Sequence, residues 1–294
     1  MIDLLMPTIA QGLLWAIMAL GVYITYRVLD IADLTVEGSF PLGAAVAASL
    51  LAGGYSPWLA FGAAMLAGML AGVATGLLPT KLKIPALLAG ILTMIALYSV
   101  NLRVMGKANL SLLRVDTVFY IMRDIGGFSN AQAVLCVGIV SSFLIGGLIY
   151  WFFGTEIGAA IRATGFNPQM IRAQGVDTNF TIILGLLISN ALVALSGALV
   201  AQNNGFADVG MGTGTIVIGL ASVIIGEVLF GTRSFKNCII SVVLGSIVYR
   251  LVIAAVLQMG MPPNDLKLFT AILVAFALSL PLIKSKLGLR KAVK

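Results

Sequence analysis

Apolar stretches close to 20 residues long recur along almost the whole chain, and this repetition constrains the fold more than any other feature. About 20 apolar residues in a helix cross the hydrocarbon core of a bilayer. Hydrophobic residues make up 60% of the 294 residues and charged residues 10%, and the mean hydropathy is +1.07. Soluble globular domains are far less apolar. The sequence therefore predicts an all-α, polytopic membrane protein, with residues 1–294 forming a single transmembrane domain.

About nine segments are long enough to span a bilayer: 8–27, 36–53, 57–79, 84–104, 131–153, 179–200, 213–231, 237–258 and 266–283. No basic residue precedes the first segment and no clear small-residue cleavage site follows it, so we expect a retained helix rather than a signal peptide. Twelve of the 18 basic residues fall in alternate loops and the C-terminal tail. The positive-inside rule then places the N-terminus outside and the C-terminus in the cytoplasm.

Several classes of function are disfavoured by what the chain lacks. It contains no histidine, which is the commonest metal ligand and general base. Cys136 and Cys238 both lie in apolar runs and resemble small buried hydrophobic residues, so we predict no metal site and no catalytic residue. The net charge of +7 comes from short basic clusters between apolar runs, without interleaved aromatic residues, so nucleic acid is not an expected partner.

Two of the predicted spans contain polar and helix-breaking residues, at 31–41 and at 202–214. Irregular backbone at membrane depth persists where protein or a water-filled cavity satisfies its polar groups. Broken segments in both halves of a transporter are typical of a solute path, although both stretches also fit ordinary extramembrane turns. Polar residues in or near these segments form the candidate translocation path: Glu37, Ser39, Asn190, Gln202, Asn203, Asn204 and Arg250.

A stripe of Gly68, Gly72 and Gly76 lies on one face of the third span, and we interpret it as a packing surface. Glu227 and Arg250 lie in the seventh and eighth spans. Their expected depths differ, so we predict that Glu227 snorkels to the inner surface and that Arg250 faces a cavity, without a direct ion pair.

The polar segment 154–177, between the fifth and sixth spans, carries the signals of a short helix. Asn167 fits the N-cap and Pro168 the first helical position, while Phe166 is placed to pack on Ile171 and Gly175 to end the helix. A helix of two turns is unstable alone in water, so we expect a partner to pack on Met170, Ile171 and Arg172.

Residues 156–175 resemble the cytoplasmic coupling region of bacterial ABC importer permeases of the branched-chain amino acid and ribose group. The matching pattern is Gly-x-Ala-x-Arg-Ala-x-Gly-x-Asn-Pro, which here begins at Gly158 and ends at Pro168. Segments 34–48 and 219–231 are similar to other parts of that family. The chain departs from the family at Glu227, where many relatives have glycine. The overall similarity is to the subgroup found with lipoprotein-type binding proteins for aromatic amino acids.

The resemblance implies a permease in a bacterial inner membrane that couples to an ATPase dimer through Glu156, Arg162, Gly165, Asn167, Pro168, Met170, Ile171, Arg172 and Gly175. The chain has no phosphate loop, so ATP and Mg²⁺ are expected on the partner ATPase. An extracytoplasmic substrate-binding lipoprotein and a second permease copy, making a homodimer, are the further implied partners. The expected solute is an amino acid. A sugar or nucleoside importer, an ion-coupled secondary transporter, a membrane enzyme and a channel remain alternatives.

Overall fold

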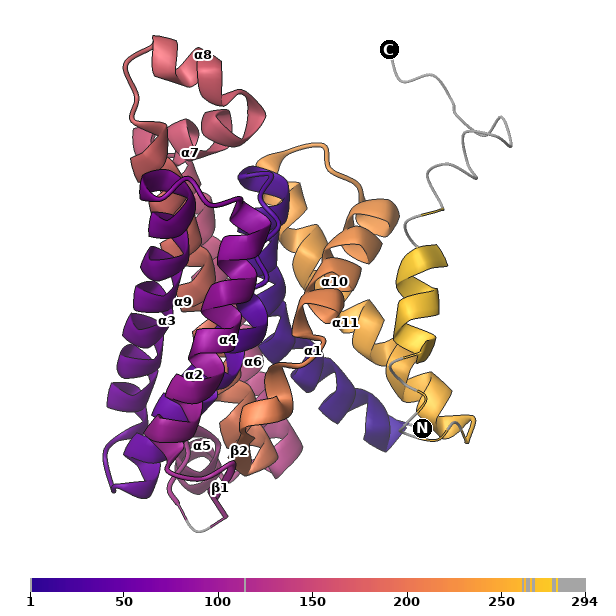
Figure 1. Cartoon of the computed structure of the whole chain (residues 1–294). Coiled ribbons are helices and arrows are strands. Elements are labelled where there is room, and N and C mark those ends of the chain that lie inside the picture. Colours follow the sequence, from indigo (N-terminus) through magenta and orange to yellow (C-terminus); the bar gives the residue numbers. More distant parts are fainter. Residues whose placement is uncertain are drawn as a thin grey trace.

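The computed structural model describes residues 2–113, 115–260, 262, 265, 268–276 and 279, and helices dominate it (Figure 1). The helices are α1 (Ile2–Tyr23), α2 (Val36–Ala52), α3 (Pro57–Lys81), α4 (Ala86–Met105), α5 (Val118–Gly126), α6 (Asn130–Phe153), α7 (Glu156–Phe166), α8 (Pro168–Ala173), α9 (Thr178–Asn204), α10 (Thr215–Phe230) and α11 (Phe235–Gln258). The shorter elements are a π-helical turn, η1 (Ile24–Val28), a 3₁₀ turn, η2 (Val209–Gly212), and the strands β1 (Asn109–Ser111) and β2 (Phe206–Asp208). The prediction of an all-α polytopic membrane protein is confirmed.

Seven helical segments in the described part of the chain are long and apolar enough to cross a membrane. They are Leu5–Val28, Pro57–Lys81, Ala86–Met105, Asn130–Phe153, Thr178–Asn204, Val209–Phe230 and Phe235–Gln258. The predicted span 36–53 corresponds to α2, which is apolar but has only 17 residues. Within the predicted span 266–283, residues 268–276 and 279 are helical, and the remainder lies outside the described residues.

Local sequence signals explain where the helices begin and end. Ser129 caps α6 by accepting a hydrogen bond from the Gln132 backbone, while the Gln132 side chain accepts one from the Ser129 backbone. Gly106 ends α4 in the left-handed conformation, with φ of 68°. These caps satisfy backbone groups that have no partner within the helix.

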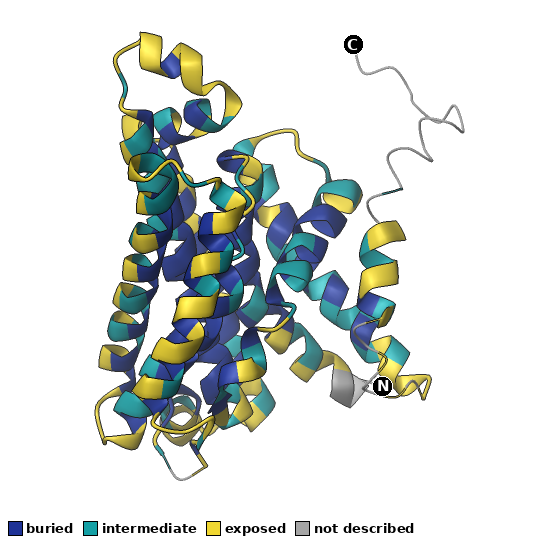
Figure 2. Cartoon of the chain, viewed as in Figure 1, coloured by how far each residue is buried: buried dark blue, intermediate teal, exposed yellow. Residues whose placement is uncertain are grey.

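Helices α1 and α9 form the centre of the bundle, and α2 and α3 pack along α9 (Figure 2). Gly68 and Gly72 of α3 face the backbone of α9 so closely that a methyl group at either would lie 2.4 Å from a carbonyl oxygen, of Asn190 and Leu186 respectively. The glycine stripe of the third span is therefore a packing surface, as predicted.

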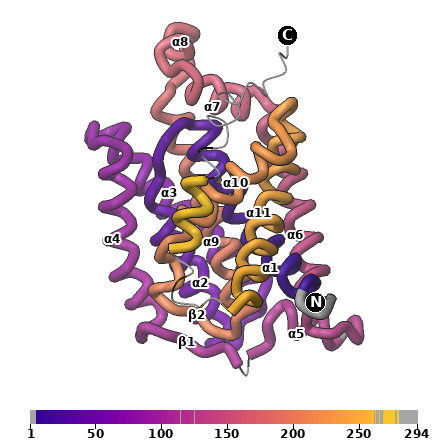
Figure 3. Tube along the Cα trace, turned by 90° about the vertical axis from the view of Figure 1, so that its right-hand side faces the viewer, coloured from indigo at the N-terminus to yellow at the C-terminus, as the bar shows by residue number. Residues whose placement is uncertain are grey.

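Large apolar side chains point outward from α3, α4 and α6, including Leu70, Leu92 and Phe143. Such a surface suits contact with lipid chains rather than with water. At one end of the bundle lie α7 and α8, and at the opposite end lie α5 and the antiparallel pair of β1 and β2 (Figure 3). Strands β1 and β2 thereby connect the segment that follows α4 with the segment that follows α9.

Candidate functional site: a coupling surface and a solute pathway

The segment 154–177 folds into two consecutive helices at one end of the molecule, α7 and α8 (Figure 1). The Asn167 side chain accepts hydrogen bonds from the backbone N–H groups of Gln169 at 3.1 Å and Met170 at 3.0 Å, and Pro168 occupies the first turn of α8. Gly175 follows α8 with φ of 87°. The predicted short helix, its N-cap, its first-turn proline and its glycine stop are all found.

The exposed surface of this helix differs from the prediction. Phe166 is 90% exposed and Met170 is 45% exposed, whereas Ile171 is 5% exposed. Phe166 therefore does not pack on Ile171, and Ile171 is not available to a partner, because it is buried within the chain itself. Arg172 is exposed, and its Nε donates a 2.6 Å hydrogen bond to the Thr178 hydroxyl at the start of α9. The outward apolar contacts that remain are Phe166 and Met170.

Helix α7 packs against the C-terminal end of the first span. A side chain at Gly165 would overlap the Val28 carbonyl oxygen, so glycine is required for this close approach. The Thr164 and Thr181 hydroxyls are 2.9 Å apart between α7 and α9. Arg162 lies over the ring of Phe235, with 5.3 Å from Cζ to the ring centroid, and Glu156 is exposed in the first turn. These contacts attach α7 to the bundle, and α8 follows it at the same end of the molecule.

A bidentate ion pair joins the first span to α10. Arg27 donates from Nε to one oxygen of Glu227 at 2.8 Å and from Nη2 to the other at 2.7 Å. The Glu227 side chain is 10% exposed, so the prediction that it snorkels freely to water is wrong. Arg27 supplies the opposite charge that makes a nearly buried carboxylate tolerable at a helix end. This pair also agrees with the predicted absence of a Glu227–Arg250 ion pair.

A chain of hydrogen bonds crosses the centre of the bundle. The Ser39 hydroxyl donates to Asn190 Oδ1 at 2.7 Å, and Asn190 Nδ2 donates to Asp33 Oδ2 at 2.9 Å. Asp33 Oδ1 also accepts from the Thr35 backbone. Ser39, Asn190 and Asp33 are all buried, so these polar groups fix α2 against α9 instead of lining an open path.

The two predicted interruptions meet each other in space. Residues 29–35 are irregular between η1 and α2, and residues 205–214 are irregular apart from β2 and η2. The Gly214 backbone N–H donates to Glu37 Oε1 at 3.0 Å, and a methyl group at Gly212 would overlap the Glu37 carbonyl oxygen. Glu37 is thus held at the junction of both broken segments, which is the arrangement expected around a solute path.

A cavity of about 360 Å³ opens beside this junction, between α2, α4 and the turn at η2. Its lining includes Glu37, Pro41, Met94, Ile95, Tyr98, Ser99, Asn101, Val209, Gly210 and Thr213. Asn101 is fully buried, and its Nδ2 donates to the Gly38 carbonyl at 3.2 Å. Our sequence reasoning missed Asn101; an amide within the apolar run 84–104 was the signal that could have identified it.

The remaining predicted path residues lie elsewhere. Gln202 is buried and accepts from the Val118 backbone at 3.1 Å, Asn203 lines a separate cavity of about 270 Å³ beside it, and Asn204 is exposed at the end of α9. Arg250 packs with its guanidinium 4.1 Å from the ring centroid of Trp15. The structure therefore brings together Ser39 with Asn190, and Gln202 with Asn203, and places Glu37 and Arg250 apart from both pairs.

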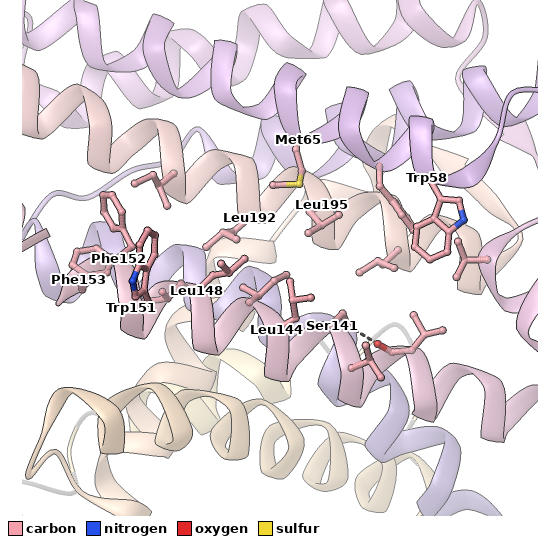
Figure 4. Close-up of a pocket in the computed structure, with 18 of the residues that line it drawn as sticks. Trp58, Met65, Ser141, Leu144, Leu148, Trp151, Phe152, Phe153, Leu192 and Leu195 are labelled. Atoms are coloured by element: carbon pink, nitrogen blue, oxygen red, sulfur yellow. Dashed lines mark hydrogen bonds between the residues drawn. The ribbon is translucent and has the colours of Figure 1, made fainter. Parts of the chain in front are cut away.

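A larger cavity of about 720 Å³ is almost wholly apolar and lies between α3, α5, α6 and α9. Trp58 stands at one end and Trp151, Phe152 and Phe153 at the other, with Met65, Leu192 and Leu195 between them (Figure 4). The Ser141 hydroxyl in its wall is already bound to the Val137 carbonyl at 2.7 Å. The cavity therefore offers an apolar surface without the placed polar groups that orient a polar solute.

Three features together indicate the class of protein. They are the long apolar helices, the two broken segments that meet at Glu37, and the short helix α8 at one end of the bundle. No group of three or more His, Cys, Asp or Glu residues suited to a metal ion occurs among the described residues. The chain has the architecture of a multi-pass membrane transport permease.

Comparison with known proteins then identifies the family. The family model described as the permease component of the branched-chain amino acid transport system matches residues 4–288. The chain belongs to this family of ABC transporter permeases. It is 41% identical over 270 residues to the tyrosine transport system permease protein of Clostridioides difficile (strain R20291), covering 92% of this chain and 88% of that protein. Membership confirms the resemblance seen in the sequence and implies an ATPase partner, and these relatives are permease subunits rather than enzymes.

One more distant relative and one solved structure are also similar to this chain. The galactofuranose transporter permease protein YtfT of Escherichia coli (strain K12) is 25% identical over 264 residues, covering 88% of this chain and 74% of that protein. Among solved structures, a transporter described as being of the metal-chelate ABC type, in an inward-facing conformation, superposes with a TM-score of 0.50 at 16% identity, covering 95% of this chain and 84% of that one. The structural likeness concerns the fold alone.

Proposed function

We propose that the chain is the permease subunit of a binding-protein-dependent ABC importer that carries an aromatic amino acid into a bacterial cell. The observation that carries the proposal is the exposure of Phe166 and Met170 on either side of the capped turn at Asn167, where α8 begins at one end of the molecule. Exposed apolar side chains on a two-turn helix favour a protein contact. The partner is a cytoplasmic ABC ATPase dimer, which binds ATP and Mg²⁺.

The distribution of charge supports the orientation. The end that carries α7 and α8 also carries Arg27, Lys81, Lys83, Arg162, Arg172, Arg233 and Lys236. At the opposite end, Arg103, Lys107 and Arg123 are accompanied by Asp116, Asp124 and Asp208. By the positive-inside rule the first end faces the cytoplasm of a bacterial inner membrane, so the N-terminus lies outside. The outer end would receive solute from a substrate-binding lipoprotein.

The solute is proposed from the tyrosine permease of Clostridioides difficile, which is 41% identical across most of both chains. The galactofuranose permease, at 25% identity, keeps a sugar as the second candidate. The buried faces of the spanning helices consist chiefly of apolar side chains, whereas sugar sites need many hydrogen-bonding groups. An amino acid is therefore the favoured solute. We further propose that the chain forms a single transmembrane domain and that two copies assemble as a homodimer.

The test is uptake of labelled L-tyrosine into vesicles that contain the permease, its ATPase and its binding protein. We expect L-tyrosine to accumulate in vesicles whose ATPase faces the lumen, and only when the lumen contains ATP. Accumulation should persist with a protonophore, since no ion gradient drives the proposed importer. Competition by aromatic amino acids but not by galactose is the expected selectivity. Loss of uptake with the protonophore at constant ATP would instead indicate an ion-coupled secondary transporter.

A further inference from the structure

The described lining of the cavity between α2, α4 and the turn at η2 includes a carboxylate, Glu37, and an amide, Asn101, but no basic side chain. Glu37 and Asn101 both line it, and within the described part of the chain no salt bridge joins Glu37 to a basic side chain. A carboxylate without a counter-charge is costly within a membrane-spanning bundle, where such groups are characteristic of functional sites. The cavity therefore has an excess of negative charge and of acceptors.

The side-chain oxygen of Asn101 lacks a hydrogen-bond donor. Its side chain is 0% exposed, and its Oδ1 has no hydrogen-bond partner. The orientation of the amide is fixed, because Nδ2 is the group that donates to the Gly38 carbonyl. A buried acceptor without a donor is rare in folded proteins. Because Asn101 belongs to the lining of the cavity, a donor group bound there would satisfy this oxygen after a small movement of the amide.

Glu37 has acceptor capacity to spare as well. Oε1 accepts from the Gly214 backbone at 3.0 Å, and no hydrogen bond to a described residue occupies Oε2. The rest of the lining combines the apolar side chains of Pro41, Met94 and Ile95 with the ring of Tyr98 and the hydroxyl groups of Ser99 and Thr213. A volume of about 360 Å³ is at the small end for ligand sites, which suits a solute of the size of an amino acid.

We propose that this cavity is a transient binding site for the ammonium group of a zwitterionic amino acid, with Glu37 and Asn101 Oδ1 accepting its hydrogen bonds. An ammonium group brings three donors and the positive charge that the cavity lacks. A sugar hydroxyl would supply a donor but no charge. Pro41, Met94, Ile95 and Tyr98 then contact the side chain of the solute. The site deepens the proposed function, and its amino acid specificity rests on that function.

The experiment compares an amine with an acid on the complete transporter of permease and ATPase in lipid nanodiscs, without the binding protein. Saturation-transfer NMR measures binding of tyramine and of 3-(4-hydroxyphenyl)propionate, after subtraction of empty nanodiscs. The site binds tyramine at least about tenfold more tightly than the acid, since a charge-assisted hydrogen bond is worth tenfold or more. Equal binding of both compounds, or no binding of tyramine, overturns the proposal.

Measuring tyramine binding to variants then tests whether the compound binds in this cavity. Glu37→Gln and Asn101→Leu each weaken tyramine binding about tenfold, whereas Asp124→Asn, which removes an exposed carboxylate on α5, leaves it unchanged. Unchanged binding in Glu37→Gln overturns the site even if L-tyrosine uptake occurs. Conversely, Glu37-dependent binding of tyramine without any L-tyrosine uptake supports the ammonium site and contradicts the proposed transport function.

Discussion

The crossing of α2 and α9 leaves no room for a methyl group, and we expect Gly43→Ala to be strongly destabilising. A methyl group at Gly43 would lie 1.9 Å from the Ala194 carbonyl oxygen, and real contacts of this kind are essentially never shorter than 3.0 Å. The helices must therefore separate locally by at least 3.0 − 1.9 = 1.1 Å. A methyl group at Gly197, on the facing helix, would likewise lie 2.0 Å from the Phe40 carbonyl oxygen. The two helices are therefore in close contact on both sides of the crossing, and a sideways shift would not remove the clash.

The separation also affects the polar centre, which lies one turn away. The Ser39–Asn190 hydrogen bond of 2.7 Å would lengthen to 2.7 + 1.1 = 3.8 Å if it opened by the full 1.1 Å, too long for a hydrogen bond. Overpacking costs about 1–3 kcal/mol, and leaving a buried polar group without its partner costs about 1–3 kcal/mol. We therefore expect Gly43→Ala to lower the free energy of unfolding by about 2–6 kcal/mol.

The assay is reversible unfolding of the purified protein in mixed detergent micelles, with Gly62→Ala as the matched control. Gly62 also lies in an apolar helix, α3, but a methyl group there meets nothing within 4 Å. Replacing glycine by alanine in a helix with free space stabilises it by about 0.5–1 kcal/mol. If Gly43→Ala proves as stable as Gly62→Ala, the reasoning from close backbone contact is refuted.

Three further predictions concern charge and coupling. In a double-mutant cycle, Arg27→Gln and Glu227→Gln should show a coupling free energy of about 1 kcal/mol for unfolding, because the pair is bidentate but Arg27 is half exposed; additive effects would exclude a stabilising pair. Asn167→Ala should cost about 1 kcal/mol by removing the N-cap of α8, measured as faster amide exchange confined to residues 168–173. Met170→Asp should lower ATP-driven uptake at an unchanged melting temperature, whereas Ile171→Asp should lower the melting temperature, since Ile171 is buried.

Features encoded by neighbouring residues were predictable from the sequence. The spans followed from runs of apolar residues, and α8 followed from Asn167, Pro168 and Gly175, which act within one or two turns of each other. The burial of Ile171 was not predictable in this way, because a two-turn helix has too few residues to show which of its faces packs inward.

Features that join distant parts of the chain escaped the sequence analysis. Arg27 and Glu227 are 200 residues apart, and no local pattern pairs them. Asp33 was visible as an acid in a broken segment, but its bond to Asn190 depends on how α2 crosses α9. Depth along the helix axis indicated correctly that Arg250 and Glu227 do not pair, yet it said nothing of Trp15, which is contributed by another helix.

The π-helical turn at the end of the first span determines the direction in which Arg27 points. In this turn the Leu29 backbone donates to the Ile24 carbonyl at 3.0 Å, five residues back instead of four. Each residue of an α-helix advances by about 100° around the axis, so the extra residue rotates everything that follows it by roughly that angle. If the same residues closed with α-helical hydrogen bonds instead, Arg27 would rotate by roughly that angle and its guanidinium would no longer face Glu227, although both charged residues would still be present. The contact between the first span and α10 is thus encoded by the number of residues as much as by their identity.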